Sequence, residues 1–144
     1  MKLHQLSLFL ENRPGQLRAP IQALADDAIN LLALSLADTE QYGILRLIVR
    51  DWETAKTALE KAGCVVKVTE VVAVEVPDRP GGLAALLKVL DEVKLNIEYM
   101  YAVTERRVDK ALMVFRFENP DDAVRVLKAA GVNVVDTIQL FSHS

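Results

Sequence analysis

The sequence predicts an α+β fold in which one βαββαβ unit occurs twice in tandem. A first observation is that residues 12–17 (NRPGQL) return as residues 78–83 (DRPGGL), 66 positions later. Both segments follow an alternating apolar run and precede a run with helical spacing. A second observation is that the match continues through the next predicted helix and, at an offset of 68, through the one after it. We therefore expect two similar domains, residues 1–69 and residues 70–144.

In the first copy, hydrophobic spacing predicts four strands and two helices. Residues 3–10 alternate between apolar and polar side chains, whereas the apolar residues between 17 and 28 share one helical face. Residues 30–37 and 44–49 form two further strands, joined by a polar turn. Asp51 can cap a second helix that Gly63 ends, and residues 65–68 make the last strand. This order is the split βαβ, or ferredoxin-like, two-layer sandwich.

The second copy repeats this order. Strands are expected at residues 71–76, 96–103, 111–117 and 134–140, and helices are expected to end near 93 and 130. Asn119 and Pro120 should start the second helix, as its cap and its first helical residue. The two extra residues of this copy are expected in a hairpin around 105–109, whose charged segment 105–107 should face solvent. In the first copy, Pro20 should loosen or delay the first helix, because proline has no N–H.

Each predicted sheet carries both helices on one face, so its other face stays uncovered. In the second copy, strict alternation along residues 96–103 places one set of side chains on the same face: Ile97, Tyr99, Tyr101 and Val103. An apolar open face on so small a unit indicates a partner, either the other copy or another chain.

Composition and charge limit the class of protein. The chain has 144 residues, of which 51% are hydrophobic and 26% charged, as in a folded, soluble protein. A formal net charge of −3 disfavours a nucleic-acid partner. Cys64 is the only cysteine, which excludes an internal disulfide and suits a reducing cytoplasm. The sequence has no secretory signal and no stretch of ~20 apolar residues, so we expect no membrane partner.

No catalytic or metal-binding constellation is recognisable, and we expect neither an enzyme nor a cofactor. The only histidines are His4 and His143; His4 is expected to pack within the first strand or to lie on the surface. No cluster of His, Cys or carboxylate residues has metal-ligand spacing, and no phosphate-binding loop occurs. RNA-recognition modules share the topology, but the strands at 44–49 and 111–117 lack their aromatic pattern.

The repeated Pro-Gly segment is the candidate binding site. Glycine lets the chain turn without a Cβ, which leaves the N–H groups of a helix N-terminus open to an anion such as a carboxylate. The alternative is that each segment is only a turn between a strand and a helix. The residues of the two segments are Asn12, Arg13, Pro14, Gly15, Gln16 and Leu17, and Asp78, Arg79, Pro80, Gly81, Gly82 and Leu83.

Asn30 and Asn96 lie at the start of the second predicted strand of each copy. Together with these asparagines, the two Pro-Gly segments resemble the ACT domain, as a tandem pair that covers nearly the whole chain. The resemblance implies a free-standing regulatory protein that binds a free amino acid without catalysing a reaction. It also implies that the ligand lies between two units, held by the Pro-Gly loop of one and the second strand of its neighbour. A homodimer and a metabolic enzyme as partner follow from the same resemblance. Asn12, Asp78 and the two other asparagines offer acceptors for the ligand's ammonium group.

Other interpretations of these residues stay open. One makes Asn30 and Asn96 turn residues that tolerate unusual backbone angles. Another makes Asp78 a cap for the helix that follows it. For the protein as a whole, the alternative is an interaction module without a ligand, which regulates or scaffolds a metabolic enzyme.

Overall fold

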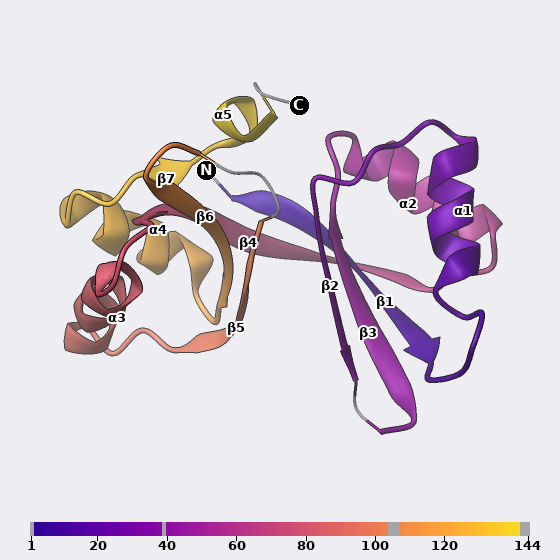
Figure 1. The fold of residues 1–144 in the computed structure, drawn as a ribbon, viewed down its shortest axis with the longest axis horizontal. Coiled ribbons are helices and arrows are strands. Elements are labelled where there is room, and N and C mark those ends of the chain that lie inside the picture. Colours follow the sequence, from indigo (N-terminus) through magenta and orange to yellow (C-terminus); the bar gives the residue numbers. More distant parts are fainter. Residues whose placement is uncertain (1, 39, 104–106, 142–144) are drawn as a thin grey trace. The chain divides into compact units, whose positions relative to one another are not determined.

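The structure, a computed structural model, describes residues 2–38, 40–103 and 107–141 (Figure 1). The chain divides into two compact units. The first unit is His4–Thr69, and the second unit is Glu70–Ser144 together with Met1–Leu3. Each unit has the element order β-α-β-β-α-β, which confirms the predicted ferredoxin-like fold and its tandem duplication.

The first unit is a four-stranded sheet with two helices on one face (Figure 1). Its elements are β1 (Leu3–Glu11), α1 (Arg18–Asp26), β2 (Ala33–Asp38), β3 (Tyr42–Ile48), α2 (Trp52–Lys61) and the start of β4 (Val66–Pro77). The strand order is β2-β3-β1-β4, and β3 runs antiparallel to β1 and β2. Alternate residues of β1 and β3 pack against both helices, and this core includes Leu6, Leu8, Leu24, Leu45, Leu47 and Leu59.

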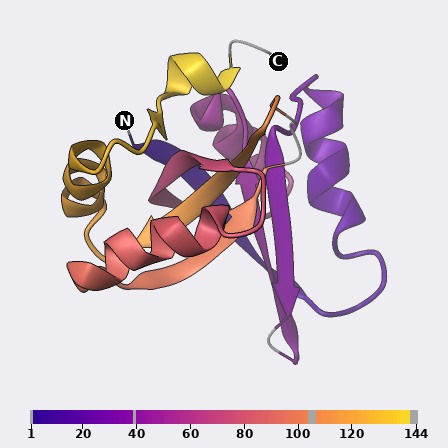
Figure 2. The ribbon, with the colours of Figure 1, turned by 60° about the vertical axis from the view of Figure 1, so that its left-hand side comes forward.

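The second unit repeats this arrangement. It contains the rest of β4, then α3 (Gly82–Glu92), β5 (Ile97–Ala102), β6 (Lys110–Phe117), α4 (Pro120–Ala129), β7 (Val134–Val135) and α5 (Thr137–Phe141). β4 lies between β6 and β7, and β5 pairs with the other side of β6. Figures 1 and 2 show α3 and α4 on the same side of this sheet. The core between them includes Val72, Val74, Leu86, Leu90, Phe115, Phe117 and Leu127.

β4 is one strand of 12 residues, where the sequence predicted two strands at 65–68 and 71–76. Thr69 and Glu70, which join the two predicted strands, include no glycine or proline, and the valines on either side favour extended backbone. β4 begins in the first unit and ends in the second. One continuous strand therefore ends the first repeat and begins the second.

The predicted helix caps are confirmed. The Asp51 side chain accepts a hydrogen bond from the Thr54 N–H (3.1 Å), and Asn119 accepts one from the Asp122 N–H (3.1 Å). Pro120 is the first residue of α4, where its missing N–H costs no helical bond. These caps fix where α2 and α4 start.

Pro20 delays α1, as predicted. α3 begins at Gly82, whereas α1 begins at Arg18, two residues later than the position that corresponds to Gly82 in the repeat. Pro20 is the third residue of α1, within the first turn, where its N–H would have no helical acceptor. The N–H of Ile21 reaches the carbonyl of Leu17 only at 3.5 Å, so the first turn is loosely bonded.

The predicted last strand, residues 134–140, is wrong beyond Val135. β7 ends there, and α5 follows. Asp136 Oδ1 accepts the N–H of Gln139 (2.8 Å), and Gln139 Oε1 accepts the N–H of Asp136 (3.3 Å). This reciprocal pair is a capping box, which stabilises the start of a helix.

Two expectations for the hairpin side of the second unit also need correction. A register shift between Ile97 and Tyr99 interrupts the alternation of β5, so that Ile97 and Met100 both pack on the helix-covered core. Arg107 was expected in a solvent-exposed tip, but its side chain is only 17% exposed and pairs with Glu75 at 2.9 Å. Residues 104–106, which include the start of the hairpin at 105–109 where the two extra residues were expected, lie outside the described residues.

Candidate functional site

The two Pro-Gly segments form the same turn. The N–H of Gln16 donates to the carbonyl of Arg13 (3.3 Å), and the N–H of Gly82 donates to the carbonyl of Arg79 (3.0 Å). The glycines at the third position have φ of +87° in Gly15 and +88° in Gly81. A proline followed by a left-handed glycine is the sequence of a type II turn. The two prolines therefore lie in the turn and precede the helices, rather than occupying their first positions.

Both turns leave backbone N–H groups without an acceptor. In the second unit these are the N–H groups of Gly81, Leu83 and Ala84, for which no acceptor exists among the described residues. In the first unit, the backbone N–H groups of four residues likewise have no acceptor among the described residues: Gly15, Leu17, Arg18 and Ala19. Unpaired N–H groups at a helix start form a site that favours anions.

Space in front of these turns is open at the central glycine. A Cβ built on Gly15 or Gly81 would meet no atom within 4 Å. Gly82 is different, because its Cβ would lie 2.0 Å from the carbonyl oxygen of Pro77. Gly82 is thus needed for the packing of the loop on its own strand, whereas the absent side chain of Gly81 leaves room on the solvent side.

The first residue of each segment is anchored, and the two anchors differ. The backbone N–H of Asn12 donates to the backbone carbonyl of Gln41 (2.9 Å), and the backbone N–H of Asp78 donates to the backbone carbonyl of Asp109 (3.0 Å). These bonds tie each loop to a hairpin. The Asn12 amide also donates to the carbonyl of Glu40 (3.0 Å). Asp78 cannot make this bond, because an ionised carboxylate only accepts. Asp78 is also not the helix cap, because that position belongs to Gly81.

Asn30 and Asn96 do not lie near the Pro-Gly loop of their own unit. β1 and β2 run parallel on either side of β3, so the loop after β1 and the residues before β2 lie at opposite ends of the sheet. The six residues of β2 span about 20 Å. The same holds for Asn96, since β5 starts beside Phe117 while β4 ends beside Lys110.

Asn96 instead lines an open depression of about 500 Å³, beside Lys88 and Asp91 of α3. Neither asparagine has a positive φ; the positive φ angles near them occur two residues earlier, at Ala28 (56°) and Lys94 (57°). Those two residues follow the ends of α1 and α3, where a left-handed residue commonly ends a helix. The asparagine side chains are therefore not required by the turn.

Other polar groups give little sign of catalysis. His4 is exposed on β1 and stacks on Trp52 with ring centroids 4.7 Å apart, in agreement with the expected packing or surface position. Burial raises the pKa of the Cys64 thiol, so the reactive thiolate is disfavoured.

Among the described residues, no three His, Cys, Asp or Glu side chains are grouped so as to hold a metal ion. No helix in the same part of the chain is long and apolar enough to cross a membrane.

Several solved structures share this fold. The chain is similar to a protein from Bacteroides thetaiotaomicron, with 38% identity, 98% of this chain and 96% of that one covered, and a TM-score of 0.91. It is also similar to the ligand-free regulatory subunit of aspartate kinase from Thermus thermophilus, with 18% identity, coverage of 88% and 91%, and a TM-score of 0.62. The corresponding subunit from Thermus flavus has 18% identity, coverage of 89% and 92%, and a TM-score of 0.61.

No curated protein matches the chain. The family described as an ACT domain pair matches residues 1–142, which is nearly the full length. This match covers both units and both Pro-Gly turns. The chain therefore belongs to the ACT domain pair family.

Proposed function

We propose that this ACT domain pair is a regulatory protein that binds a free amino acid and catalyses no reaction. The observation that supports the proposal is the set of open N–H groups at Gly81, Leu83 and Ala84, repeated in the first unit. A carboxylate seated on these groups gains charge-assisted hydrogen bonds at a helix start. The exposed Gly81 leaves space for it, because no side chain covers the turn.

The ammonium group of the ligand needs acceptors close to the carboxylate site. Asp78 is exposed at the start of the second loop, and no partner occupies its carboxylate within the described residues. Asn12 has only its side-chain oxygen left as an acceptor, because its amide donates to Glu40. The second loop, with its negative charge, should therefore bind the ammonium more strongly than the first.

A complete site needs two units, since Asn30 and Asn96 lie about 20 Å from the loop of their own unit. We therefore propose that the loop of one unit and the asparagine of another hold the ligand between them, in a homodimer. On this proposal, residues 1–69 and 70–144 are the two functional domains. The protein works in the cytoplasm and acts on a metabolic enzyme.

The second candidate is an interaction module without a ligand that regulates or scaffolds such an enzyme. Thermal unfolding with each of the twenty amino acids separates the two candidates. A ligand at a hundred times its Kd stabilises the folded state by about 2.7 kcal/mol. If none of the twenty raises Tm, the interaction module is the better conclusion.

Calorimetric titration of the amino acid found in this way then tests the site. Asn96→Ala should weaken binding by about 1–3 kcal/mol, because it leaves a charged partner without its hydrogen bond. Gln22→Ala is the matched control, since Gln22 is exposed on α1 and its side chain, among the residues that the structure describes, bonds only to Asp26 of its own helix (2.9 Å). Wild-type affinity in Asn96→Ala contradicts the proposed site, and a monomer of 16.0 kDa by light scattering with ligand present contradicts the dimer.

A further inference from the structure

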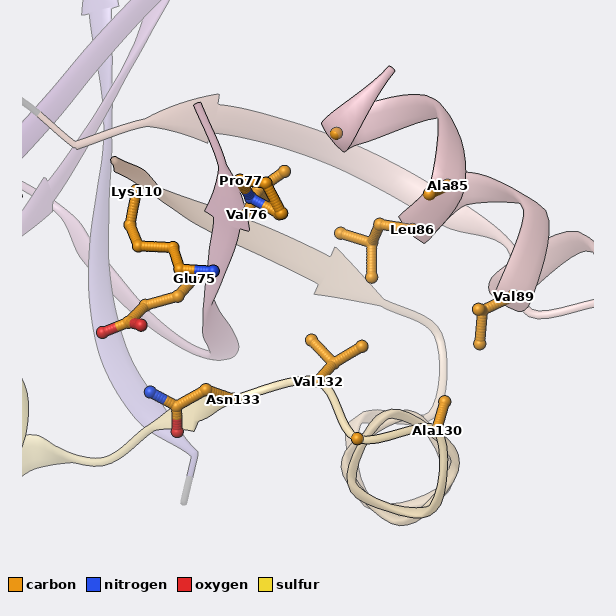
Figure 3. A pocket seen from close by; sticks show the side chains of 12 residues that line it. Glu75, Val76, Pro77, Ala85, Leu86, Val89, Lys110, Ala130, Val132 and Asn133 are labelled. Atoms are coloured by element: carbon orange, nitrogen blue, oxygen red, sulfur yellow. The ribbon is translucent and has the colours of Figure 1, made fainter. Parts of the chain in front are cut away.

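The second unit contains a cavity that none of the predicted site residues except Gly82 lines. Its volume is about 330 Å³, which is at the lower end of small-molecule pockets. It opens between α3, the last residues of β4 and the connection from α4 to β7 (Figure 3). The walls are aliphatic side chains: Val76, Pro77, Ala85, Leu86, Val89 and Val132.

Polar side chains gather at one end of this cavity. Figure 3 shows Glu75, Lys110 and Asn133 together at one end of the opening, with Leu86, Val89 and Val132 toward the other. A pocket with an apolar body and a few convergent polar groups is the usual form of a small-molecule site. The ligand should therefore have a compact aliphatic body and a polar head.

The charges at the polar end favour an anionic head. Glu75 is already neutralised by Arg107, whose Nη1 lies 2.9 Å from the carboxylate, and both side chains are more than four-fifths buried. Lys110 is exposed, and no acidic partner for its ammonium occurs among the described residues. The Asn133 side chain likewise makes no hydrogen bond within that part of the chain, and its amide can donate.

The polar end is specific to the second unit. The positions that correspond to Glu75, Lys110 and Asn133 in the first repeat are Phe9, Tyr42 and Val65. Those three side chains are 62%, 50% and 81% exposed. The duplication alone therefore does not explain why three polar groups meet at this end of the cavity.

We propose that this cavity binds a small aliphatic carboxylate without an α-ammonium group, such as a branched-chain 2-oxo acid. The carboxylate is held by Lys110 and Asn133, and the aliphatic body lies against Leu86, Val89 and Val132. Arg107 already compensates the negative charge of Glu75, so the uncompensated charge at this end is that of Lys110, and a zwitterionic amino acid binds less well. This site is separate from the one formed by the Pro-Gly loops.

Calorimetric titration with 4-methyl-2-oxopentanoate tests the proposal, with leucine and 3-methylbutan-1-ol as probes that differ only in the head group. At the cavity, measured as the binding that Ala85→Leu abolishes, the oxo acid should bind at least tenfold more tightly than either. Lys110→Met should weaken oxo-acid binding about tenfold or more, as expected for the loss of a charged hydrogen-bond partner. Lys128→Met, which removes an exposed lysine of α4, should leave the affinity unchanged.

A second pair of variants tests the apolar end. Ala85→Leu fills the cavity from an exposed position of α3 and should abolish binding, whereas Ala129→Leu, at an exposed position of α4 that does not line the cavity, should not. Absence of oxo-acid binding by the wild-type chain, an unchanged affinity in Lys110→Met or in Ala85→Leu, or tighter binding of leucine that Ala85→Leu abolishes would each overturn the proposal. The two proposals fail separately, because amino-acid binding at the loops depends on Asn96 and not on Lys110.

Discussion

Replacing Gly81 by alanine should destabilise the protein through the backbone alone. Gly81 has φ +88° and ψ −11°, a left-handed conformation that costs an L-residue with a Cβ about 1–2 kcal/mol. A Cβ at this position meets no atom within 4 Å, so no steric term adds to this cost. For a chain of this length, 1–2 kcal/mol corresponds to a fall in Tm of about 2–8 °C.

Urea unfolding of the protein without ligand measures this cost directly. Gly81→Ala should lower the midpoint and leave the m-value unchanged, since the surface exposed on unfolding is the same. Gly15→Ala is the matched variant, because Gly15 has the same φ and the same empty surroundings. Gly81→Asn should lose less, because asparagine tolerates the left-handed region. A midpoint equal to that of the wild type, or an asparagine variant less stable than the alanine variant, would refute this reasoning.

Three further outcomes are expected. Gly82→Ala should be more damaging than Gly81→Ala, because its Cβ would lie 2.0 Å from a backbone oxygen and the loop must move; equal urea midpoints would contradict this. Glu75→Gln should cost about 1–3 kcal/mol by chemical denaturation, because it leaves the part-buried Arg107 without its counter-charge, and an unchanged free energy of unfolding would contradict this. Hydrogen bonds from Thr54 lower the pKa of Asp51, so Asp51 stabilises the fold above its unfolded pKa and this contribution is lost as pH falls through the folded pKa. In Asp51→Asn, Tm should therefore fall less steeply than in the wild type as the pH drops below 4. The same dependence of Tm on pH in both proteins would exclude this role.

Local signals in the sequence were sufficient to predict most of the helices, strands and turns. The Pro-Gly pairs predicted both turns because only glycine adopts φ near +88° without strain, and Asp51 and Asn119 predicted helix starts by capping chemistry. The helix at the C-terminal end was missed although Asp136 and Gln139 have capping-box spacing, because the apolar residues around them also fit a strand.

Features that depend on contacts between distant residues were not predictable in this way. The bulge of β5 is set by its pairing with β6, which spacing along one strand does not reveal. Burial of Arg107 follows from its pairing with Glu75, 32 residues away. The polar end of the cavity brings together three residues from different parts of the chain: Glu75, Lys110 and Asn133. In the sequence, each of them looks like an ordinary surface residue.

The continuity of β4 restricts how the junction between the two repeats can change in length. Val66 and Val68 pack against the core of the first unit, and Val72, Val74 and Val76 belong to the core of the second. All five share one side of the strand, because side chains alternate with a period of two. Inserting one residue between Val68 and Val72 would turn one of these sets to the opposite face, whereas inserting two would return both to their cores. Among descendants of the duplicated sequence, the length of this junction is therefore expected to vary in steps of two residues.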